Sequence, residues 1–319
     1  KPYHMLKFLS ILIFILQSCN SKMDPSYFRS VSNTDNITTQ KITKMQIMVT
    51  SDNNSAPFNV FLKKNNIQKV GFVGDGQFLD PKIKFALNQK MLDQEILRVY
   101  PNQAEEGIAY IDLESPYLEY LMNSETNSLE FKKSKKLFLD VLTYVKKARP
   151  KVKWGFYNIP FTTYWGKTTS FYDKDERVSE IIKNSDVLFP SIYIFYNKVN
   201  FILENEDYIK ENTQQIIRIG EKYNKKVYPL VMSRYHPSSG NIAYETINET
   251  DFRFYLSTIK NTKYKEKSVD GIMYWNADAY FYKTNENKVV AEVQKSRMPF
   301  NTFYDNYLIN TLSIFLEIK

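Results

Sequence analysis

Apolar runs of strand length alternate with helical stripes along most of this chain. Near-continuous apolar runs of this kind suit strands that are buried on both faces of a parallel sheet. The candidate strands are 57–61, 69–74, 96–101, 107–114, 152–160, 186–195, 227–235 and 271–277. Strands and helices that alternate about eight times favour an α/β fold, a single TIM-like barrel of the (β/α)8 type, over two domains.

Four helices are predicted from apolar residues that recur at helical spacing. The first stripe runs through Phe131, Phe138 and Val145 and stops before Pro150. Two further stripes cover 209–219 and 252–259, and a last helix spans 302–318. The gap between residues 61 and 69 is too short for a helix, so we expect the barrel to be irregular at its first repeat.

The amino-terminal segment has the pattern of a secretion signal. Lys7 precedes a short apolar run that ends at Leu16, too short to span a bilayer and typical of a signal peptide. The sequence Leu16-Gln17-Ser18-Cys19 resembles a bacterial lipobox, and Cys19 is the only cysteine of the chain. We therefore expect a signal peptide over 1–19 with lipidation at Cys19, a flexible tether over 20–45, and one barrel domain over 46–319. The protein would then be a lipid-anchored monomer of the bacterial cell envelope.

Charge and aromatic content favour a polysaccharide partner. The formal net charge is +8, which would attract a polyanionic polysaccharide, a nucleic acid or a membrane surface. The lysines are scattered and no nucleic-acid-binding motif accompanies them, so nucleic acid is the weaker option. The chain also has 24 Tyr and 22 Phe, and rings of this kind can pack on the apolar faces of sugars. A compositional bias would also produce many Tyr, together with the many Lys, Asn and Ile, so the count alone does not decide.

Two carboxylates mark the end of one predicted strand. Asp112 and Glu114 are spaced i, i+2, so on a strand their side chains point to the same face. They stand at the carboxyl end of the apolar run, where barrel enzymes place their chemistry. Carboxyls this close do not both ionise readily, so one can hold a proton near neutral pH and act as a general acid, as glycosidic cleavage requires. The alternative is that an Asp and a Glu simply end a strand and cap the next helix.

Other kinds of catalysis find little support. With two His, His4 and His236, and one Cys, the chain cannot assemble a zinc site, and we expect no metal or cofactor. A Ser-His-Asp triad would need His236, and no G-x-S-x-G motif is present. The sequence Gly74-Asp75-Gly76 lacks the third glycine of a nucleotide-binding loop and is interpreted as a turn.

Three more strand ends carry polar and aromatic groups in an order that suggests a family. The motifs are Trp154-Gly155-Phe156-Tyr157, Phe189-Pro190-Ser191-Ile192-Tyr193 and the run from Gly271 to Trp275. Together with Asp112-Leu113-Glu114, they resemble the hyaluronidases of glycoside hydrolase family 56 over roughly residues 57 to 285. The chain departs from the family in having Leu113 between the carboxylates, a shortened segment after residue 61, and Thr163 at the position of a family tyrosine, with Tyr164 one place further on.

The resemblance implies a hyaluronidase-like retaining endo-glycosidase that cleaves N-acetylhexosamine linkages in hyaluronan or chondroitin by substrate-assisted catalysis. Glu114 would be the acid and base, and Asp112 its partner. The substrate-binding residues would include Tyr193 and Trp275, followed by Tyr157 and Tyr164. The alternatives are a chitinase-like hexosaminidase and a lipid-anchored glycan-binding protein without turnover. The chitinase motif is disfavoured because Gly107 and Tyr110 stand where it requires Asp.

Overall fold

The computed structural model describes residues 45–319 apart from residue 81 and residues 166–172. The chain separates into two units, Lys1–Thr43 and Lys44–Lys319. The described residues all belong to the second unit, and every structural statement below concerns that unit alone.

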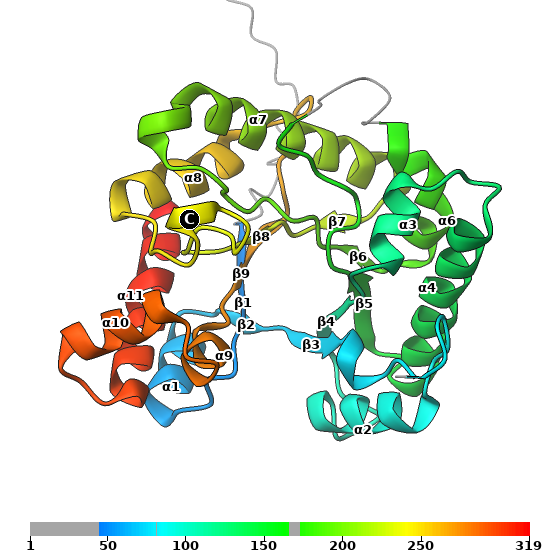
Figure 1. Cartoon of the computed structure of the whole chain (residues 1–319), viewed down its shortest axis with the longest axis horizontal. Coiled ribbons are helices and arrows are strands. Elements are labelled where there is room, and N and C mark those ends of the chain that lie inside the picture. The colour runs from blue at the N-terminus through cyan, green and yellow to red at the C-terminus, as the bar shows by residue number, and fades with distance from the viewer. Residues whose placement is uncertain (1–44, 81, 166–172) are drawn as a thin grey trace, which may run out of the picture. The chain divides into compact units, whose positions relative to one another are not determined.

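The strands of this unit are all parallel to their neighbours. They are β1 (Gln46–Thr50), β2 (Gln68–Lys69), β3 (Gly71–Gly74), β4 (Gly107–Asp112), β5 (Val152–Phe156), β6 (Val187–Leu188), β7 (Lys226–Val227), β8 (Leu230–Val231) and β9 (Gly271–Trp275). Figure 1 shows them at the centre, with helices outside.

The strands form a closed ring. The hydrogen-bonded orders are β2-β1-β9-β8, β3-β4-β5 and β6-β7. Val70 alone separates β2 from β3, and single bridges connect Tyr157 with Phe189 and Ser191 with Leu230. If β2 with β3, and β7 with β8, are each counted as one interrupted strand, seven strand positions close the described barrel. The fold is an irregular barrel of the (β/α)8 type, with seven strand positions among the described residues.

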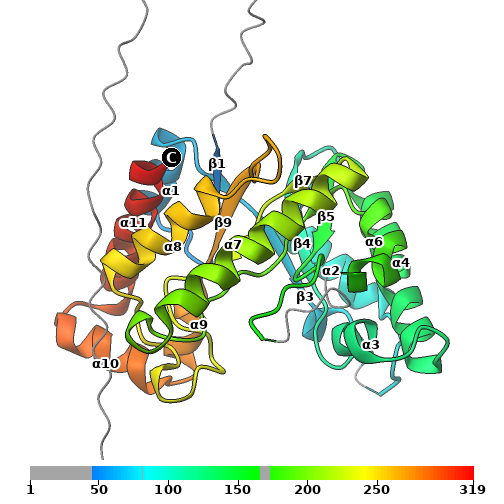
Figure 2. The ribbon, with the colours of Figure 1, turned by 90° about the horizontal axis from the view of Figure 1, so that it is seen from above.

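The helices surround this ring (Figures 1 and 2). They are α1 (Ala56–Lys64), α2 (Gln89–Val99), α3 (Tyr117–Asn123), α4 (Leu129–Ala148), α6 (Ser179–Asn184), α7 (Lys198–Tyr223), α8 (Glu249–Asn261), α9 (Asp278–Lys283), α10 (Asn287–Ser296) and α11 (Phe300–Ile318). Helices α4, α7, α8 and α11 confirm the four predicted from periodicity. Ser128 caps α4 by accepting a hydrogen bond from the Phe131 amide, which explains where that helix begins.

Two predicted strands are wrong. The segment 57–61 lies in α1, where Ser55 caps the helix and Pro57 occupies its first turn. The segment 96–101 contains the end of α2, whose buried Leu92 and Ile96 are one helical turn apart. Short apolar runs fit helices as well as strands, and tertiary packing decides between them. The true first strand, β1, was missed because it follows directly on the polar amino-terminal segment.

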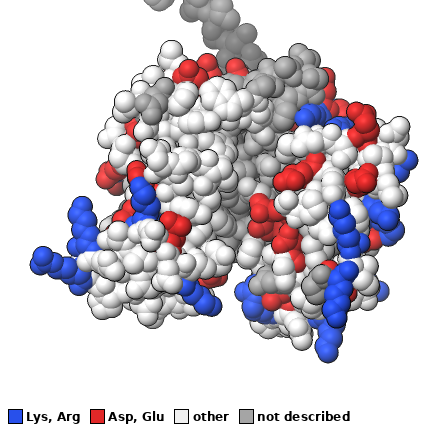
Figure 3. All heavy atoms as spheres, in the orientation of Figure 1, with Lys and Arg blue, Asp and Glu red and all other residues white. Residues whose placement is uncertain are grey.

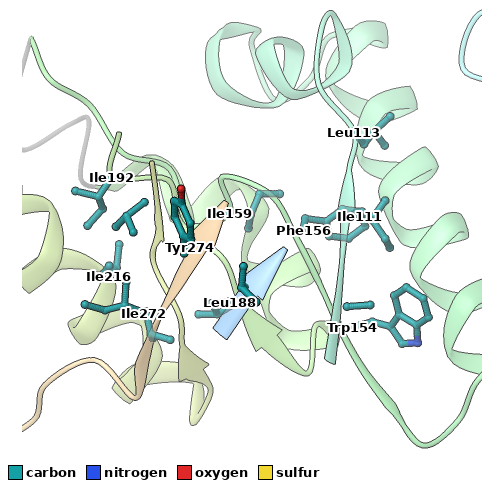
Figure 4. Packing of buried hydrophobic residues seen from close by; sticks show 14 of the residues in the cluster. Ile111, Leu113, Trp154, Phe156, Ile159, Leu188, Ile192, Ile216, Ile272 and Tyr274 are labelled. Atoms are coloured by element: carbon teal, nitrogen blue, oxygen red, sulfur yellow. The ribbon is translucent and has the colours of Figure 1, made fainter. Parts of the chain in front are cut away.

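The core lies between the strands and the outer helices. Figure 4 shows Ile111 and Phe156 pointing from β4 and β5 toward the neighbouring helices. Phe156 packs against Phe138 of α4 with ring centroids 4.7 Å apart. Trp154 of β5 is fully buried and belongs to this core. This packing fixes the carboxyl ends of β4 and β5, where the site begins.

Among the described residues, no helix is both long enough and apolar enough to cross a bilayer.

Candidate active site

The residues predicted from the strand ends gather on one rim of the barrel. Because neighbouring strands are parallel, their carboxyl ends meet at the same edge. Asp112 ends β4, Tyr157 follows β5, and Trp275 ends β9. Glu114 lies two residues beyond Asp112, and Tyr193 lies in the segment that follows β6. The structure therefore brings the five residues to one side of the barrel.

Asp112 is held in surroundings that disfavour its charge. Its Oδ1 atom is buried and has no hydrogen-bond partner among the described residues. Burial raises the pKa of Asp112 well above its usual range, and the carboxylates of Glu114 and Asp75 raise it further. Asp112 is therefore suited to hold a proton at a pH where an ordinary aspartate has lost it.

Glu114 has a raised pKa for similar reasons, although its side chain reaches solvent. Partial desolvation by the surrounding protein is the main cause, followed by the negative charges of Asp75 and Glu119. Because water screens an exposed group, we rely only on the direction of this shift. A carboxyl that keeps its proton toward neutral pH and remains accessible has the properties of a general acid.

Aromatic rings form a wall beside the two carboxyls. The Tyr193 ring stacks on Tyr157 with centroids 6.2 Å apart and contacts Trp275 at 5.9 Å. Tyr193 is buried, whereas Tyr157 and Trp275 are half-buried and keep part of their surface open. Burial raises the pKa of both tyrosines, so their hydroxyls remain protonated and can donate hydrogen bonds. Rings that combine an apolar face with a donor are suited to a sugar.

Tyr164 lies in an adjoining open pocket of about 430 Å³, which Tyr157 and Tyr193 also line. Its hydroxyl donates a hydrogen bond to Asn205 Oδ1 at 2.9 Å, and its ring packs against Trp165 and Tyr196. Only 7% of the residue is exposed. Tyr164 thus supports the pocket wall, and its hydroxyl is already hydrogen-bonded to Asn205.

Asp75 was missed as a site residue, because its Gly-Asp-Gly motif was interpreted only as a turn. In the structure, it follows β3, whose Gly74 pairs in register with Asp112. Its Oδ2 accepts a hydrogen bond from the Glu114 amide at 3.3 Å. The available signal was its position after a strand, but the sequence did not show that β3 and β4 are neighbours.

His236 was considered only for a triad and lies instead among the rings. It stacks on Tyr193 with centroids 5.8 Å apart and packs against Phe195. Burial lowers the pKa of His236 to about 4, so the ring is neutral near neutral pH. The described segments contain no group of three or more His, Cys, Asp or Glu side chains placed to bind a metal ion. Cys19 lies outside the described residues.

Comparisons with known proteins agree with this geometry. The family model described as hyaluronidase, glycoside hydrolase family 56, matches residues 95–310. Hyaluronidase A from Vespa velutina is 26% identical over 185 residues, which cover 54% of this chain and 50% of the wasp protein. Hyaluronidase Tab y 2.0101 from Tabanus yao is 22% identical over 233 residues, covering 60% of this chain and 62% of that protein. The chain thus spans half to about three fifths of these relatives.

Solved structures show the same fold. Bee venom hyaluronidase in complex with a hyaluronic acid tetramer superposes with a TM-score of 0.55 and 15% identity, covering 80% of this chain and 100% of the bee chain. A monoclinic crystal form of bee venom hyaluronidase gives a TM-score of 0.59 and 14% identity, covering 84% and 99%. The family model covers most of the barrel and includes both carboxylates and all three rings of the site. The chain belongs to the hyaluronidase family, glycoside hydrolase family 56.

Proposed function

We propose that this protein is a retaining endo-glycosidase that cleaves N-acetylhexosamine linkages in a polysaccharide. The observation that carries the proposal is the pair of carboxyls with raised pKa at the barrel rim, beside the stacked rings of Tyr157, Tyr193 and Trp275. Its relatives are named hyaluronidases, so hyaluronan is the reference substrate and chondroitin the next to test.

Glu114 supplies the proton in the first step. The carbonyl oxygen of the substrate's own 2-acetamido group attacks the anomeric carbon while the glycosidic bond breaks. The leaving oxygen takes the proton of Glu114, which leaves an oxazolinium ring on the sugar and a carboxylate on Glu114. Substrate assistance of this kind is a recognised exception to the scheme with two opposed carboxylates.

Water completes the reaction in the second step. Glu114 now accepts a proton from a water molecule as the water attacks the anomeric carbon from the side that the leaving group vacated. The oxazolinium ring opens, the acetamido group is restored and the anomeric configuration is retained. Glu114 regains its proton and is ready for another cycle.

The neighbouring residues orient the acetamido group. Asp112, whose pKa is raised by burial and by the neighbouring carboxyls, shares a proton with Glu114 or holds the acetamido nitrogen. The Tyr193 hydroxyl donates toward the acetamido oxygen, and Trp275 forms the wall of the pocket that holds its methyl group. Two carboxyls on one strand end suit this arrangement better than the opposed acid and nucleophile, about 5 Å apart, of a double displacement.

Product analysis tests this function. Purified protein is incubated with hyaluronan, chondroitin and chitin oligosaccharides, and the size of the products is followed. We expect a thiazoline mimic of the cyclised intermediate to inhibit competitively, and hyaluronan stripped of its N-acetyl groups to resist cleavage. A covalent glycosyl ester trapped on an Asp or Glu would contradict the mechanism. Binding without any cleavage would indicate a glycan-binding protein instead.

We further propose that the enzyme is anchored to the bacterial cell envelope by lipid on Cys19. The support is the sequence Leu16-Gln17-Ser18-Cys19 directly after the short apolar run. An anchored glycosidase would act on polysaccharide outside the cytoplasm.

A further inference from the structure

Tyr110 lies on the same strand as Asp112, two residues before it. Both belong to β4, and the intervening Ile111 points toward the outer helices (Figure 4). Because side chains alternate along a strand, Tyr110 and Asp112 point together into the barrel. The Tyr110 ring packs there against Phe72 and Phe189, with ring centroids 5.3 and 5.7 Å away. The ring is therefore held inside the barrel, below the rim at which Asp112 ends the strand.

The hydroxyl group of Tyr110 is buried without a hydrogen-bond partner among the described residues. Only 1% of the residue is exposed. The Oδ1 atom of Asp112 is the other polar atom of this strand in the same situation. Burying a hydroxyl that makes no hydrogen bond costs free energy, so a phenylalanine would suit this interior position better. The hydroxyl of Tyr110 therefore needs an explanation other than packing.

Two more side chains lie near this hydroxyl, although neither meets the geometry of a hydrogen bond with it. Thr50, at the end of β1, already donates its own hydroxyl proton to the Val70 carbonyl oxygen at 3.0 Å. The indole N–H of Trp275 is a donor only, so it can approach the oxygen of Tyr110 but cannot accept its proton. The proton of the Tyr110 hydroxyl is thus free to turn toward Asp112.

The described titratable groups around Asp112 come from the ends of four strands, β3 to β6. Burial raises the pKa of Asp112, and the charges of Glu114 and Asp75 raise it further. Burial also raises the pKa of Tyr157 and Tyr193, and the charge of Asp112 contributes to both shifts. Figure 3 shows Asp and Glu side chains along one wall of the central hollow. A negative charge on Asp112 therefore develops beside other acidic groups, where a hydroxyl donor has a large effect.

Tyr110 is suited to be such a donor. Burial raises its pKa well above the usual range, and the charge of Asp112 raises it further. The phenol consequently stays protonated over the whole pH range in which carboxyl groups titrate. A hydroxyl dipole that is already in place stabilises a charge that develops near it, because it needs no reorganisation at that moment.

We propose that Tyr110 is a positioning residue that acts through Asp112. Its hydroxyl proton turns toward Oδ1 when Asp112 is ionised, and it stabilises the negative charge that faces the oxazolinium ring. The inference rests on the proposed function, because this ring forms only in the substrate-assisted reaction. Tyr110 makes and breaks no covalent bond, and it keeps its proton throughout the cycle. Without its hydroxyl, Asp112 would hold a proton to higher pH.

Tyr110→Phe tests this role, and it removes only a buried hydroxyl that has no described partner. We expect the acidic limb of the pH profile of kcat/KM for hyaluronan to move up by about one pH unit, because ionised Asp112 loses its donor. The basic limb, which reports the last proton on the carboxyl pair, should move less. Urea unfolding should show no loss of stability. An unchanged acidic limb would overturn the inference.

Tyr304→Phe is the matched control. Tyr304 of α11 is 4% exposed, and its hydroxyl is likewise buried without a hydrogen-bond partner among the described residues. Burial raises its pKa, followed by the charges of Asp278 and Asp52, which do not belong to the carboxyl pair. We expect this variant to keep the pH profile of the wild type. If both variants shift the acidic limb equally, the effect is general to buried hydroxyls and the role of Tyr110 is wrong.

Binding of the thiazoline inhibitor separates action through Asp112 from action on the pocket wall. The protonated thiazoline carries the charge of the oxazolinium ring, so we expect Tyr110→Phe to weaken its binding roughly tenfold. The same substitution should have no further effect in an Asp112→Asn background, as calorimetry on the four proteins of a double-mutant cycle measures. An equal loss in both backgrounds would show that Tyr110 acts through packing on Trp275, and it would contradict the inference.

The same experiments distinguish this inference from the proposed function. If the wild type cleaves no polymer, the proposed function is refuted and the inference falls with it. If the wild type cleaves hyaluronan and Tyr110→Phe matches it in pH profile and in thiazoline binding, the glycosidase stands and the role of Tyr110 alone is refuted.

Discussion

At the scale of single residues, the surroundings of two carboxyl groups decide the chemistry. Asp112 and Glu114 share the end of one strand, and the structure adds Asp75 from the neighbouring strand. The negative charge of Asp75 raises the pKa of both Asp112 and Glu114, which favours their protonated forms. This crowding suits Glu114 to the role of general acid that we propose for it.

Glu114→Gln should abolish hydrolysis while glycan binding survives. The amide keeps the shape of the side chain but cannot deliver a proton, and loss of a positioned general acid costs roughly 10²–10⁴ in rate. Turnover and oligosaccharide binding are measured on the same preparation. Glu119→Gln is the matched control: it removes a nearby charge and should retain most of the activity. Near wild-type turnover in Glu114→Gln would refute the assignment.

Asp112→Asn should reduce turnover and yet stabilise the fold at neutral pH. The folded-state pKa of Asp112 lies above its unfolded value, so the folded protein binds the proton more tightly. Stability is then lost as pH rises from the unfolded to the folded pKa. An Asn does not titrate, so the gain should be absent well below pH 4 and present near pH 7. Urea unfolding at both pH values measures it, and equal effects at the two would contradict the raised pKa.

At the scale of elements, the strands are short, and several site residues lie in the segments that follow them. A buried ion pair connects Arg234, which follows β8 and lies two residues before His236, with Asp278, which begins α9 three residues after Trp275. Arg234 and Asp278 are each 1% exposed, with Nε bonded to Oδ1 at 2.9 Å and Nη2 to Oδ2 at 2.7 Å. Glu292 also accepts from Arg234 Nη2 at 2.8 Å. This network supports the wall of the site that contains His236 and Trp275.

Arg234→Met should destabilise the protein by about 3–5 kcal/mol, because it leaves Asp278 buried without its cation. Replacing both partners, in Arg234→Met with Asp278→Leu, should restore part of this loss. Chemical denaturation of the single and double variants measures the difference. Lys136→Ala is the control, since it breaks an exposed helical pair with Asp140 and should cost about 0.5 kcal/mol or less. A loss no larger than that control would contradict the role of the network.

The sequence predicted some elements well and others badly for physical reasons. Helix α4 was predicted because its apolar stripe continues for several turns and stops before a proline, Pro150. Helix α1 was mistaken for a strand because a short apolar run is too brief to show which period it follows. Several strands are only two residues long, so they are defined by their neighbours in the barrel more than by their own sequence.

At the scale of the whole molecule, the segment that precedes the barrel bears on where the protein acts. The sequence predicts a signal peptide, a lipidated Cys19 and a tether ahead of the first strand. The barrel would then act at the end of a tether, and its reach over a polysaccharide would depend on the length of that tether.

Wild-type protein produced in a bacterial host should partition with membranes, and the Cys19→Ala variant should not be lipidated. Mass spectrometry of the mature amino terminus measures the modification directly. Ser18→Thr, which changes the residue before Cys19 but keeps the thiol, distinguishes the lipobox from a simple need for cysteine. An unmodified Cys19 within an uncleaved chain would refute the anchor.

The sequence by itself determined the class of fold, the helices with long apolar stripes, and the pairing of Asp112 with Glu114. These features are local, since they depend on the period of side chains along one element. Resemblance in the ordered strand-end motifs also indicated the family, which the family model confirms.

The tertiary structure decided what surrounds that pair. Asp75 reaches Glu114 from 39 positions away, and Tyr193 meets Tyr157 and Trp275 from three different strand ends. The pocket beside the pair likewise combines residues from 157 to 238. The net charge of +8 favoured a polyanionic partner, but a sum over the chain does not record where each charge lies. Closure of the barrel fixes those positions, because strand neighbours are chosen by packing and hydrogen bonding across the sheet.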